Sequence, residues 1–158
     1  MNHVHVYSAV ATASNKIYVM GGKNISDMAI SNVEEYDPLT NIWTNKAAIP
    51  ETTYYAAAAT VNGKIYLFGG LGNSINPIAL NTVREYNPAT NTWSTKANMP
   101  TARYGAGAVA INGKIYVAGG LTQNLATDVL EVYDPVTNTW DATKAKMPYP
   151  AAYGGVGG

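Results

Sequence analysis

The chain has 158 residues, with ten basic and ten acidic side chains that cancel, and no cysteine. The balanced charge and the lack of a basic run argue against nucleic acid as a partner and against an electrostatic membrane anchor, and no apolar run approaches the roughly 18 residues that cross a bilayer. Because the first residues also lack a secretion signal, we expect a soluble chain without disulfides, thiolate metal sites or cysteine nucleophiles.

One short tract occurs three times, at residues 16–22, 64–70 and 114–120, as Lys-Ile-Tyr, two apolar residues and a glycine pair. A tyrosine follows each tract, and a tryptophan follows that tyrosine by seven positions. The repeated residues are Gly21, Gly22, Tyr36 and Trp43, then Gly69, Gly70, Tyr86 and Trp93, then Gly119, Gly120, Tyr133 and Trp140. A period near fifty residues predicts a repeat architecture.

Each unit contains signals for four strands. The first two strands are joined by Asn-Gly at 62–63 and 112–113 and by Ser-Asn at 14–15, and Asn-Gly favours a two-residue hairpin turn. A third strand around the tyrosine ends in an Asp/Asn-Pro-x-Thr-Asn turn, in which proline presets the backbone, and the fourth strand begins at the tryptophan. Because no helical period occurs, we expect an all-β chain of four-stranded antiparallel meanders.

Residue types indicate where each strand lies. The first strand is rich in alanine and glycine, as at 104–109, which suits a crowded place where several sheets converge. The glycine pairs permit close backbone approach, and the tyrosines and tryptophans of the outer strands can pack against the next sheet. Each unit therefore has the features of a β-propeller blade.

The glycine pair, the spaced tyrosine and tryptophan, and the proline-containing turn together resemble the kelch repeat, over about residues 3–148. The resemblance implies a ring of about five to seven blades around a central channel, with a partner or substrate held by the loops of one face. The units span about 3–48, 51–98 and 101–147. Residues 149–158 resemble the start of a fourth inner strand, because Tyr153 and the two glycines after it echo Tyr104 and the two residues that follow it.

Three blades do not close a ring, and an open arc would expose the apolar faces of its end blades. A second copy of the chain would close a six-bladed ring with two-fold symmetry, which predicts a homodimer. The other solution is that the chain is part of a longer propeller whose remaining blades complete the ring. The incomplete strand at 149–158 favours this second solution.

The loops after the glycine pairs and between the units vary, whereas the short turns on the opposite face hardly change. Variable loops on a rigid scaffold are a usual place for recognition. Alignment of the units places His5, Thr53 and Arg103 at one position of the channel mouth, followed by Tyr54 and Tyr104. We expect these five residues to hold a carboxylate, a sugar or a peptide, since arginine offers a planar fork and tyrosine a stacking face.

Arginines near this position bind acidic peptides in some kelch proteins, so the resemblance implies the same role for Arg103. Substitution of Arg103 by alanine is then expected to weaken an anionic ligand without changing stability. In the alternative, Arg103 pairs with a neighbouring loop carbonyl, and the tyrosines pack against their surroundings.

We expect no catalytic site, no metal site and no cofactor. No nucleophile elbow, phosphate loop or His-Glu-x-x-His motif occurs, and galactose-oxidase-like chemistry needs a cysteine that the chain lacks. The two histidines near the start have no carboxylate at matching spacing. Four acids of the third strands are expected to lie on solvated edges: Glu34, Glu35, Glu85 and Glu131.

The sequence therefore favours a non-enzymatic kelch module for protein binding or self-assembly. Two alternatives remain open. One is a carbohydrate-active enzyme or sugar-binding module similar to kelch sialic-acid epimerases or mutarotases, and the other is a purely structural half-propeller, engineered or evolved, that self-associates. The Asn- and Thr-rich turns resemble bacterial kelch repeats of surface or secreted proteins, which implies such a location for a parent protein.

Overall fold

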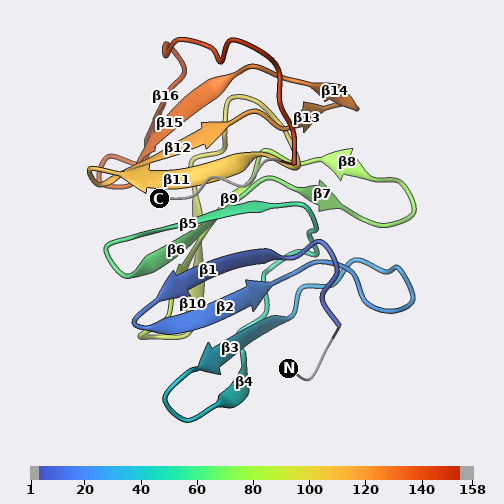
Figure 1. Cartoon of the computed structure of the whole chain (residues 1–158), viewed down its shortest axis with the longest axis vertical. Coiled ribbons are helices and arrows are strands. Elements are labelled where there is room, and N and C mark those ends of the chain that lie inside the picture. The colour runs from blue at the N-terminus through green and yellow to red at the C-terminus, as the bar shows by residue number, and fades with distance from the viewer. Residues whose placement is uncertain (1–3, 154–158) are drawn as a thin grey trace.

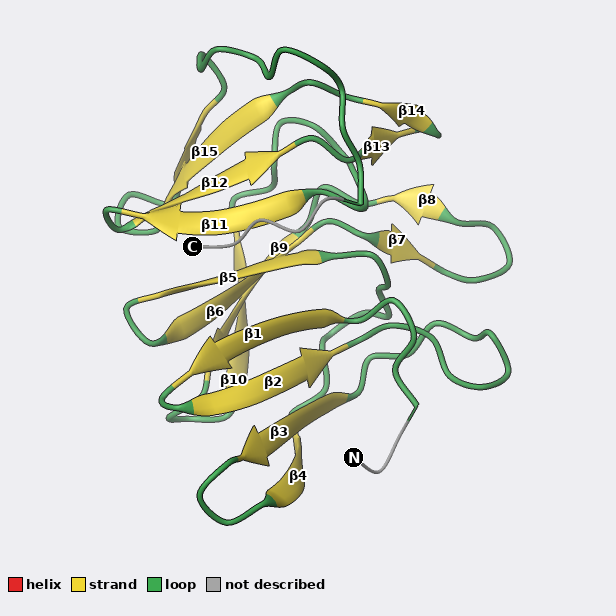
Figure 2. Cartoon of the chain, viewed as in Figure 1, coloured by secondary structure: helices red, strands yellow, loops and turns green. Residues whose placement is uncertain are grey.

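The computed structural model describes residues 4–153, and this part of the chain contains strands but no helices (Figures 1 and 2). Residues 1–3 and 154–158 lie outside the described residues, and they include His3 and the two glycines of the predicted fourth inner strand. No helix in the described part of the chain is long and apolar enough to cross a membrane.

Three four-stranded antiparallel sheets follow one another along the chain, and we call them blades 1 to 3. Blade 1 consists of β1 (Ala9–Ala13), β2 (Lys16–Met20), β3 (Val33–Asp37) and β4 (Ile42–Lys46). Blade 2 consists of β5 (Ala57–Val61), β6 (Lys64–Phe68), β9 (Val83–Asn87) and β10 (Thr92–Lys96). Blade 3 consists of β11 (Gly107–Ile111), β12 (Lys114–Ala118), β15 (Leu130–Asp134) and β16 (Thr139–Asp141).

Two short hairpins extend from blades 2 and 3: β7 (Leu71–Gly72) pairs with β8 (Ile78–Ala79), and β13 (Leu121–Thr122) pairs with β14 (Leu125–Ala126). The predicted all-β chain of four-stranded antiparallel sheets is confirmed.

The turns fix the register within each blade. Asn62 and Gly63 have φ angles of 51° and 74°, as a two-residue hairpin of the predicted type requires. The seven-residue spacing of the aromatic residues has an equally simple cause, since each tyrosine lies directly opposite its tryptophan across the third and fourth strands. In blade 2 the ring centroids of Tyr86 and Trp93 are 4.9 Å apart.

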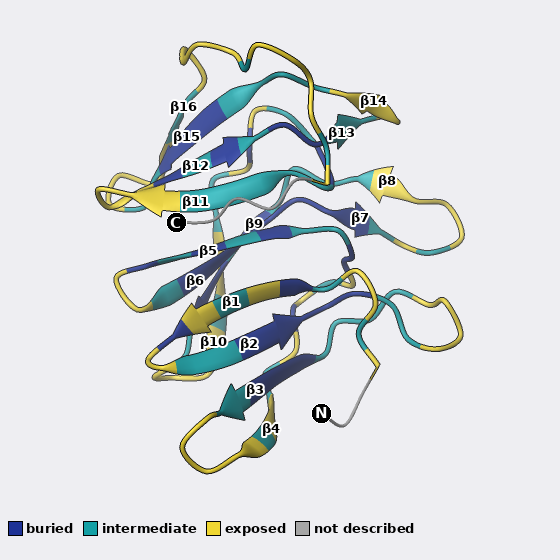
Figure 3. Cartoon of the chain, viewed as in Figure 1, coloured by how far each residue is buried: buried dark blue, intermediate teal, exposed yellow. Residues whose placement is uncertain are grey.

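The first strands of the blades, β1, β5 and β11, lie next to one another where the three sheets converge (Figure 1). Their small residues allow this approach, as predicted. The sheets pack face to face, and one apolar cluster fills the space between blades 1 and 2 while a second fills the space between blades 2 and 3. Figure 3 shows the buried positions concentrated along the two middle strands of each blade, whereas the outermost strands are mostly exposed or half-buried.

A pair of hydrogen bonds joins the outer edges of neighbouring blades. The Trp93 indole N–H donates to the Ala47 carbonyl at 2.9 Å, and the Ala47 amide donates to Asn91 Oδ1 at 2.8 Å. The next junction repeats both bonds at the same distances, between Trp140, Ala97 and Asn138. The asparagine that ends the proline-containing turn is therefore needed for blade-to-blade contact as well as for the turn.

The expectation that the acids of the third strands lie on solvated edges is wrong. Glu35 and Glu85 are 5% and 6% exposed, and both lie between blades. Glu85 accepts a hydrogen bond of 2.6 Å from the Tyr66 hydroxyl, and it forms ion pairs of 2.9 Å with Lys64 and 3.1 Å with Lys96. The neighbouring strands β6 and β10 therefore supply polar partners that stabilise the Glu85 carboxylate in a buried position. An alternation of polar and apolar residues does not predict this, because it places charged residues in solvent.

This network predicts a dependence of stability on pH. Burial alone would raise the pKa of Glu85, but the hydrogen bonds from Tyr66, Lys64 and Lys96 outweigh it and lower the pKa from 4.5 to about 2. A carboxylate with a lowered pKa in the folded state stabilises the fold above pH 4.5 and loses this contribution as the pH falls towards 2. Thermal unfolding followed by circular dichroism should show the melting temperature falling across this window.

The variant Glu85→Gln should be less stable at pH 7 by about 1.5 to 3 kcal/mol, the usual contribution of hydrogen bonds to a charged group. It should also show a smaller drop between pH 4.5 and 2. The control is Asp27→Asn, which removes a carboxylate whose side chain is 81% exposed. Equal pH profiles for Glu85→Gln and the unmodified chain would contradict the assignment.

Candidate functional site

The two faces of the blade array differ in the loops they carry. The tight hairpin turns lie on one face, at the left of Figure 1, and the long connections lie on the opposite face. On this long-loop face the chain leaves each glycine pair and enters the first strand of each blade. The loops that differ between blades therefore begin or end near the ends of the innermost strands.

A line of backbone hydrogen bonds crosses the blades on this face. Tyr7, Tyr55, Gly105 and Tyr153 occupy equivalent positions, and all four have positive φ angles between 56° and 62°. The amide of each of the last three donates to the carbonyl of the one before it, at 2.9, 2.8 and 2.8 Å. This line joins the entrances of successive inner strands.

Five tyrosines gather around this line, and we call them the tyrosine cluster: Tyr7, Tyr54, Tyr55, Tyr104 and Tyr153. The Tyr7 and Tyr55 ring centroids are 4.3 Å apart, and the Tyr55 and Tyr153 centroids are 5.2 Å apart. Tyr54 and Tyr104 form the buried base, whereas Tyr7 and Tyr153 are 49% and 58% exposed. The cluster thus exposes aromatic rings to solvent, and the buried rings of Tyr54 and Tyr104 pack beneath them.

A glycine makes room for this cluster in blade 3. A Cβ atom at Gly105 would lie 2.8 Å from Cε1 of Tyr153, so any side chain there would collide with the Tyr153 ring. The structure therefore places Tyr153 in register with Gly105, Tyr55 and Tyr7. The sequence comparison that matched Tyr153 with Tyr104 was wrong by one residue.

His5, Thr53 and Arg103 do occupy equivalent positions, and all three perform the same task. Each donates a hydrogen bond to the carbonyl of the first glycine of a pair. The distances are 2.7 Å from His5 Nδ1 to Gly21, 3.1 Å from Thr53 Oγ1 to Gly69, and 3.0 Å from Arg103 Nη1 to Gly119. These side chains hold the end of the second strand in place.

Arg103 is 1% exposed and lies against Glu131, with 2.6 Å between Nη2 and Oε2. Its Nη1 also donates to the Val129 carbonyl at 3.0 Å, and Thr101 donates to Glu131 at 2.6 Å. Burial lowers the pKa of Arg103, and the Glu131 charge acts in the opposite direction. These contacts correspond to the alternative in which Arg103 pairs with loop carbonyls.

The other blades contain an acid and a base at the same place. In blade 1, His5 Nε2 lies 3.6 Å from Glu34 Oε2, and in blade 2, Arg84 lies 2.9 Å from Glu51. In blade 2 the base lies on the third strand and the acid in the loop before the blade, whereas in blade 3 the acid lies on the third strand and the base in that loop. The sequence already contained a signal of this pairing, because the third-strand position of Glu34 and Glu131 is occupied by Arg84 in blade 2.

Tyr54 and Tyr104 are also held by their neighbours. The Tyr104 hydroxyl donates to Asn124 Oδ1 at 2.7 Å, and Lys23 Nζ lies 4.5 Å from the centre of the Tyr54 ring. Sequence reasoning missed three rings one aligned position further along the units: the exposed Tyr7 and Tyr153 and the half-buried Tyr55. A tyrosine shared by positions 7 and 55 of aligned units was the signal that could have identified them.

The long loops of the same face carry further apolar side chains. Exposed side chains there include Ile25, Ile75, Ile78 and Leu125, each at least 66% exposed. A hollow of about 380 Å³ lies between the β7–β8 hairpin and the loop at Gln123 and Asn124, with Tyr104 at its wall. Among residues 4–153, no group of three or more His, Cys, Asp or Glu side chains is arranged to hold a metal ion.

Comparison with known proteins identifies the family. A model of the KLHDC2/KLHL20/DRC7 Kelch-repeats domain matches residues 2–156. Relatives include human Kelch-like protein 33, 36% identical over 69 residues, which are 44% of this chain and 13% of that protein. Beta-scruin of Limulus polyphemus is 35% identical over 71 residues, and an F-box/kelch-repeat protein of Arabidopsis thaliana is 43% identical over 63 residues.

The match to beta-scruin covers 45% of this chain and 8% of that protein, and the match to the plant protein covers 40% and 15%. The chain therefore corresponds to only a small part of each of these relatives. The family match, in contrast, extends over nearly all of its residues. The chain belongs to the kelch-repeat family.

Proposed function

We propose that the chain is a non-enzymatic kelch module that binds a protein segment through its long-loop face. Kelch-repeat proteins are in general protein-binding or scaffold modules. The observation that carries the proposal is the tyrosine cluster, whose rings Tyr7 and Tyr153 are exposed on the face that also carries the long loops. Rigid aromatic side chains of this kind supply much of the binding energy at protein interfaces.

The electrostatics of the face favour a neutral partner. Arg103 is buried against Glu131, and Lys23 is paired with Asp27 at 3.0 Å. Arg84, the other arginine among the described residues, is paired with Glu51 at 2.9 Å, so neither guanidinium is free to bind an acidic peptide. An extended segment with aromatic, proline or aliphatic side chains matches the tyrosine rings and the hollow beside Tyr104, because both are largely apolar.

The test is a selection of random displayed peptides on the unmodified chain, followed by affinity measurements with Tyr7→Ala. We expect the selected peptides to lose at least about tenfold in affinity, as for the loss of one interface anchor. The control Leu39→Ala removes a side chain that is 93% exposed on the opposite face and should change nothing. Selected peptides that bind Tyr7→Ala as well as they bind the unmodified chain would exclude the tyrosine cluster as the site.

A neutral sugar is the second candidate ligand, because exposed tyrosine faces also stack on sugar rings and Asn124 offers an amide beside them. The same Tyr7→Ala comparison with a panel of neutral oligosaccharides separates the two candidates. A carbohydrate-active enzyme would require an acid and base on this face. The acids Glu34 and Glu131 instead lie buried beside His5 and Arg103.

We also propose that the recognition face is completed when the ring of blades is closed. The added blades come from a second copy, which would make the chain a self-assembling homodimer, or from a longer parent protein. In both cases the residues at this position of successive blades, Tyr7 and Tyr55 among them, would surround a channel mouth. A module whose only property is self-association is the remaining alternative, and failure of every peptide and sugar to bind would favour it.

A further inference from the structure

We propose that two copies of the chain join head to tail, with blade 3 of each copy seated on blade 1 of the other, through the contacts that already join blades within one chain. This inference rests on the self-assembly proposed above, and it names the surfaces and atoms involved. Because the same junction occurs twice about a two-fold axis, the two copies form a closed ring.

The free face of blade 1 has the composition of a buried junction. In blade 2 the equivalent face packs on blade 1, and Ile65 and Tyr86 there are fully buried. Their counterparts Ile17 and Tyr36 in blade 1 are only partly buried, and Val10 beside them is 56% exposed. The counterparts in blade 3, Ile115 and Tyr133, are again fully buried against the preceding blade.

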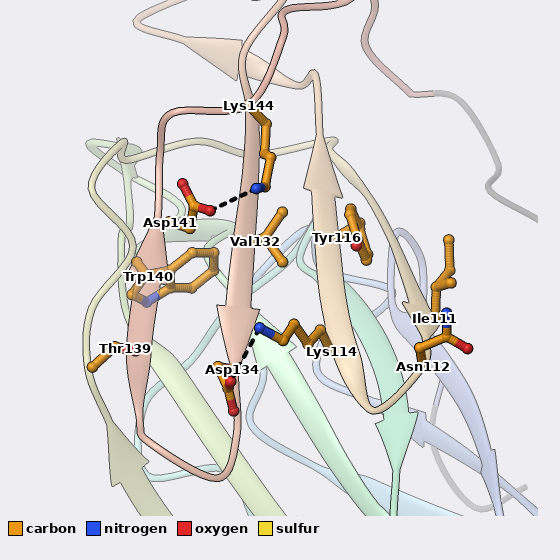
Figure 4. Close-up of a pocket in the computed structure, with 10 residues that line it drawn as sticks. All are labelled: Ile111, Asn112, Lys114, Tyr116, Val132, Asp134, Thr139, Trp140, Asp141 and Lys144. Atoms are coloured by element: carbon orange, nitrogen blue, oxygen red, sulfur yellow. Dashed lines mark ion pairs between the residues drawn. The ribbon is translucent and has the colours of Figure 1, made fainter.

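The free face of blade 3 is the complementary surface. Tyr18 and Tyr66 are 1% and 3% exposed in blades 1 and 2, but their counterpart Tyr116 is only partly buried. A hollow of about 320 Å³ lies there, with Tyr116, Val132 and Trp140 among its lining residues (Figure 4).

A tyrosine of the following blade lies against the equivalent position in both internal junctions. The ring centroids of Tyr18 and Tyr86 are 5.7 Å apart, and those of Tyr66 and Tyr133 are 5.8 Å apart. By the same repeat, the hollow beside Tyr116 is the seat for Tyr36 of the partner subunit.

The charges around this hollow do not oppose the contact. Lys114 pairs with Asp134 at 3.3 Å, and Lys144 pairs with Asp141 at 2.7 Å, as the dashed lines of Figure 4 show. Val132 stands where Glu35 and Glu85 stand in the other blades, so this face has no buried carboxylate that would need a partner. The surface is apolar at its centre with neutralised charges at its edge.

The hydrogen-bonding groups of the edge are also in place. Asn41 has a φ angle of 58° and accepts the Tyr36 hydroxyl at 2.8 Å, as Asn91 accepts that of Tyr86. By the repeat, the Trp43 indole N–H donates to the carbonyl of the partner subunit's Ala145, whose amide donates to Asn41. Ala145 follows Lys144 as Ala47 and Ala97 follow their lysines.

The inner strands supply a third contact. Thr60 Oγ1 in blade 2 donates to the Thr12 carbonyl in blade 1 at 2.8 Å. Thr12 is the counterpart of Thr60, and Ala110 is the counterpart in blade 3. The ring therefore brings Thr12 of one copy next to Ala110 of the other.

One segment must move for this junction to form. The Gly120 amide donates to the Ala151 carbonyl at 2.7 Å, as the Gly22 amide donates to Thr53, so residues 151–153 already occupy the path into a following blade. Residues 5–7 of the partner would require the same path. Removal of residues 149–158 should therefore strengthen the dimer at least about tenfold, since it removes the competing segment.

The experiment uses the natural absence of cysteine. The variant Thr12→Cys/Val109→Cys places one thiol on the free face of blade 1 and one on the free face of blade 3, and it is oxidised and run on a non-reducing gel, with and without residues 149–158. Ala11→Cys/Thr60→Cys is the positive control, because both side chains lie between blades 1 and 2 and their disulfide would form within one chain. We expect a covalent dimer of about twice 16.7 kDa from the first variant and a covalent monomer from the control.

Light scattering over a range of concentrations accompanies the gel. A dimer that does not crosslink would overturn the proposed junction and leave self-assembly intact. A monomer at all concentrations, with and without residues 149–158, would overturn self-assembly itself. A ladder of higher multimers would overturn the closed two-copy ring.

Trp43→Ala should weaken the dimer at least about tenfold while the circular dichroism spectrum is retained, because it removes an interface aromatic residue.

Discussion

The variant Arg103→Ala is expected to lose about 3 to 5 kcal/mol of folding stability, because it leaves the Glu131 carboxylate buried without its counter-charge. Glu131 is 1% exposed and lies 2.6 Å from the guanidinium. The same substitution removes the donors to the Gly119 and Val129 carbonyls. Chemical unfolding followed by tryptophan fluorescence should show the loss directly.

The double variant Arg103→Met/Glu131→Leu is the informative control. It removes both charges and fills a similar volume, so it should recover most of the stability that the single substitution loses. An Arg103→Ala protein as stable as the unmodified chain would contradict the structural role. That result would favour the other interpretation of the sequence, in which Arg103 binds an anionic ligand.

The second large effect is expected for Trp93→Ala, which should cost about 3 to 5 kcal/mol, toward the lower end because the indole is only partly buried. Trp93 packs at the junction of blades 1 and 2 and donates to the Ala47 carbonyl. Unfolding by denaturant, measured by circular dichroism, is the appropriate assay.

Trp43→Ala provides the matched comparison for this prediction. Trp43 stacks on Tyr36 at 5.0 Å as Trp93 stacks on Tyr86, but no described blade precedes blade 1. Under dilute conditions, where the chain is monomeric, Trp43→Ala should therefore cost clearly less than Trp93→Ala. Equal costs for the two substitutions would mean that the tryptophan stabilises its own sheet rather than the junction.

Much of the blade architecture could be predicted because local chemistry determines it. Asn-Gly pairs require positive φ, so the first hairpins and their register follow from residues 62–63 and 112–113 alone. The tyrosine and tryptophan seven positions apart face each other because a short turn joins their strands. Such features depend on neighbours within a few residues.

The candidate site depends on contacts that are distant in the sequence, and this is why the sequence left two interpretations of Arg103 open. The alignment of His5, Thr53 and Arg103 was sound, but their burial depends on partners such as Glu131, 28 positions after Arg103. A residue pattern also gives no indication that these side chains bind the glycine carbonyls, because a backbone carbonyl is present at every position. The shift of Tyr153 by one position arose because Gly105 has no side chain with which to mark the register.

The hydrogen-bond line from Tyr7 to Tyr153 has a consequence for how the molecule opens. Its amides at Tyr55 and Gly105 are bonded across blades rather than within them, and the Tyr153 amide joins the last described segment to blade 3. Separation of two intact blades would expose them to solvent while the amides inside each sheet stay protected. Their hydrogen-exchange rates therefore report the free energy that couples one repeat to the next, separately from the stability of a single repeat.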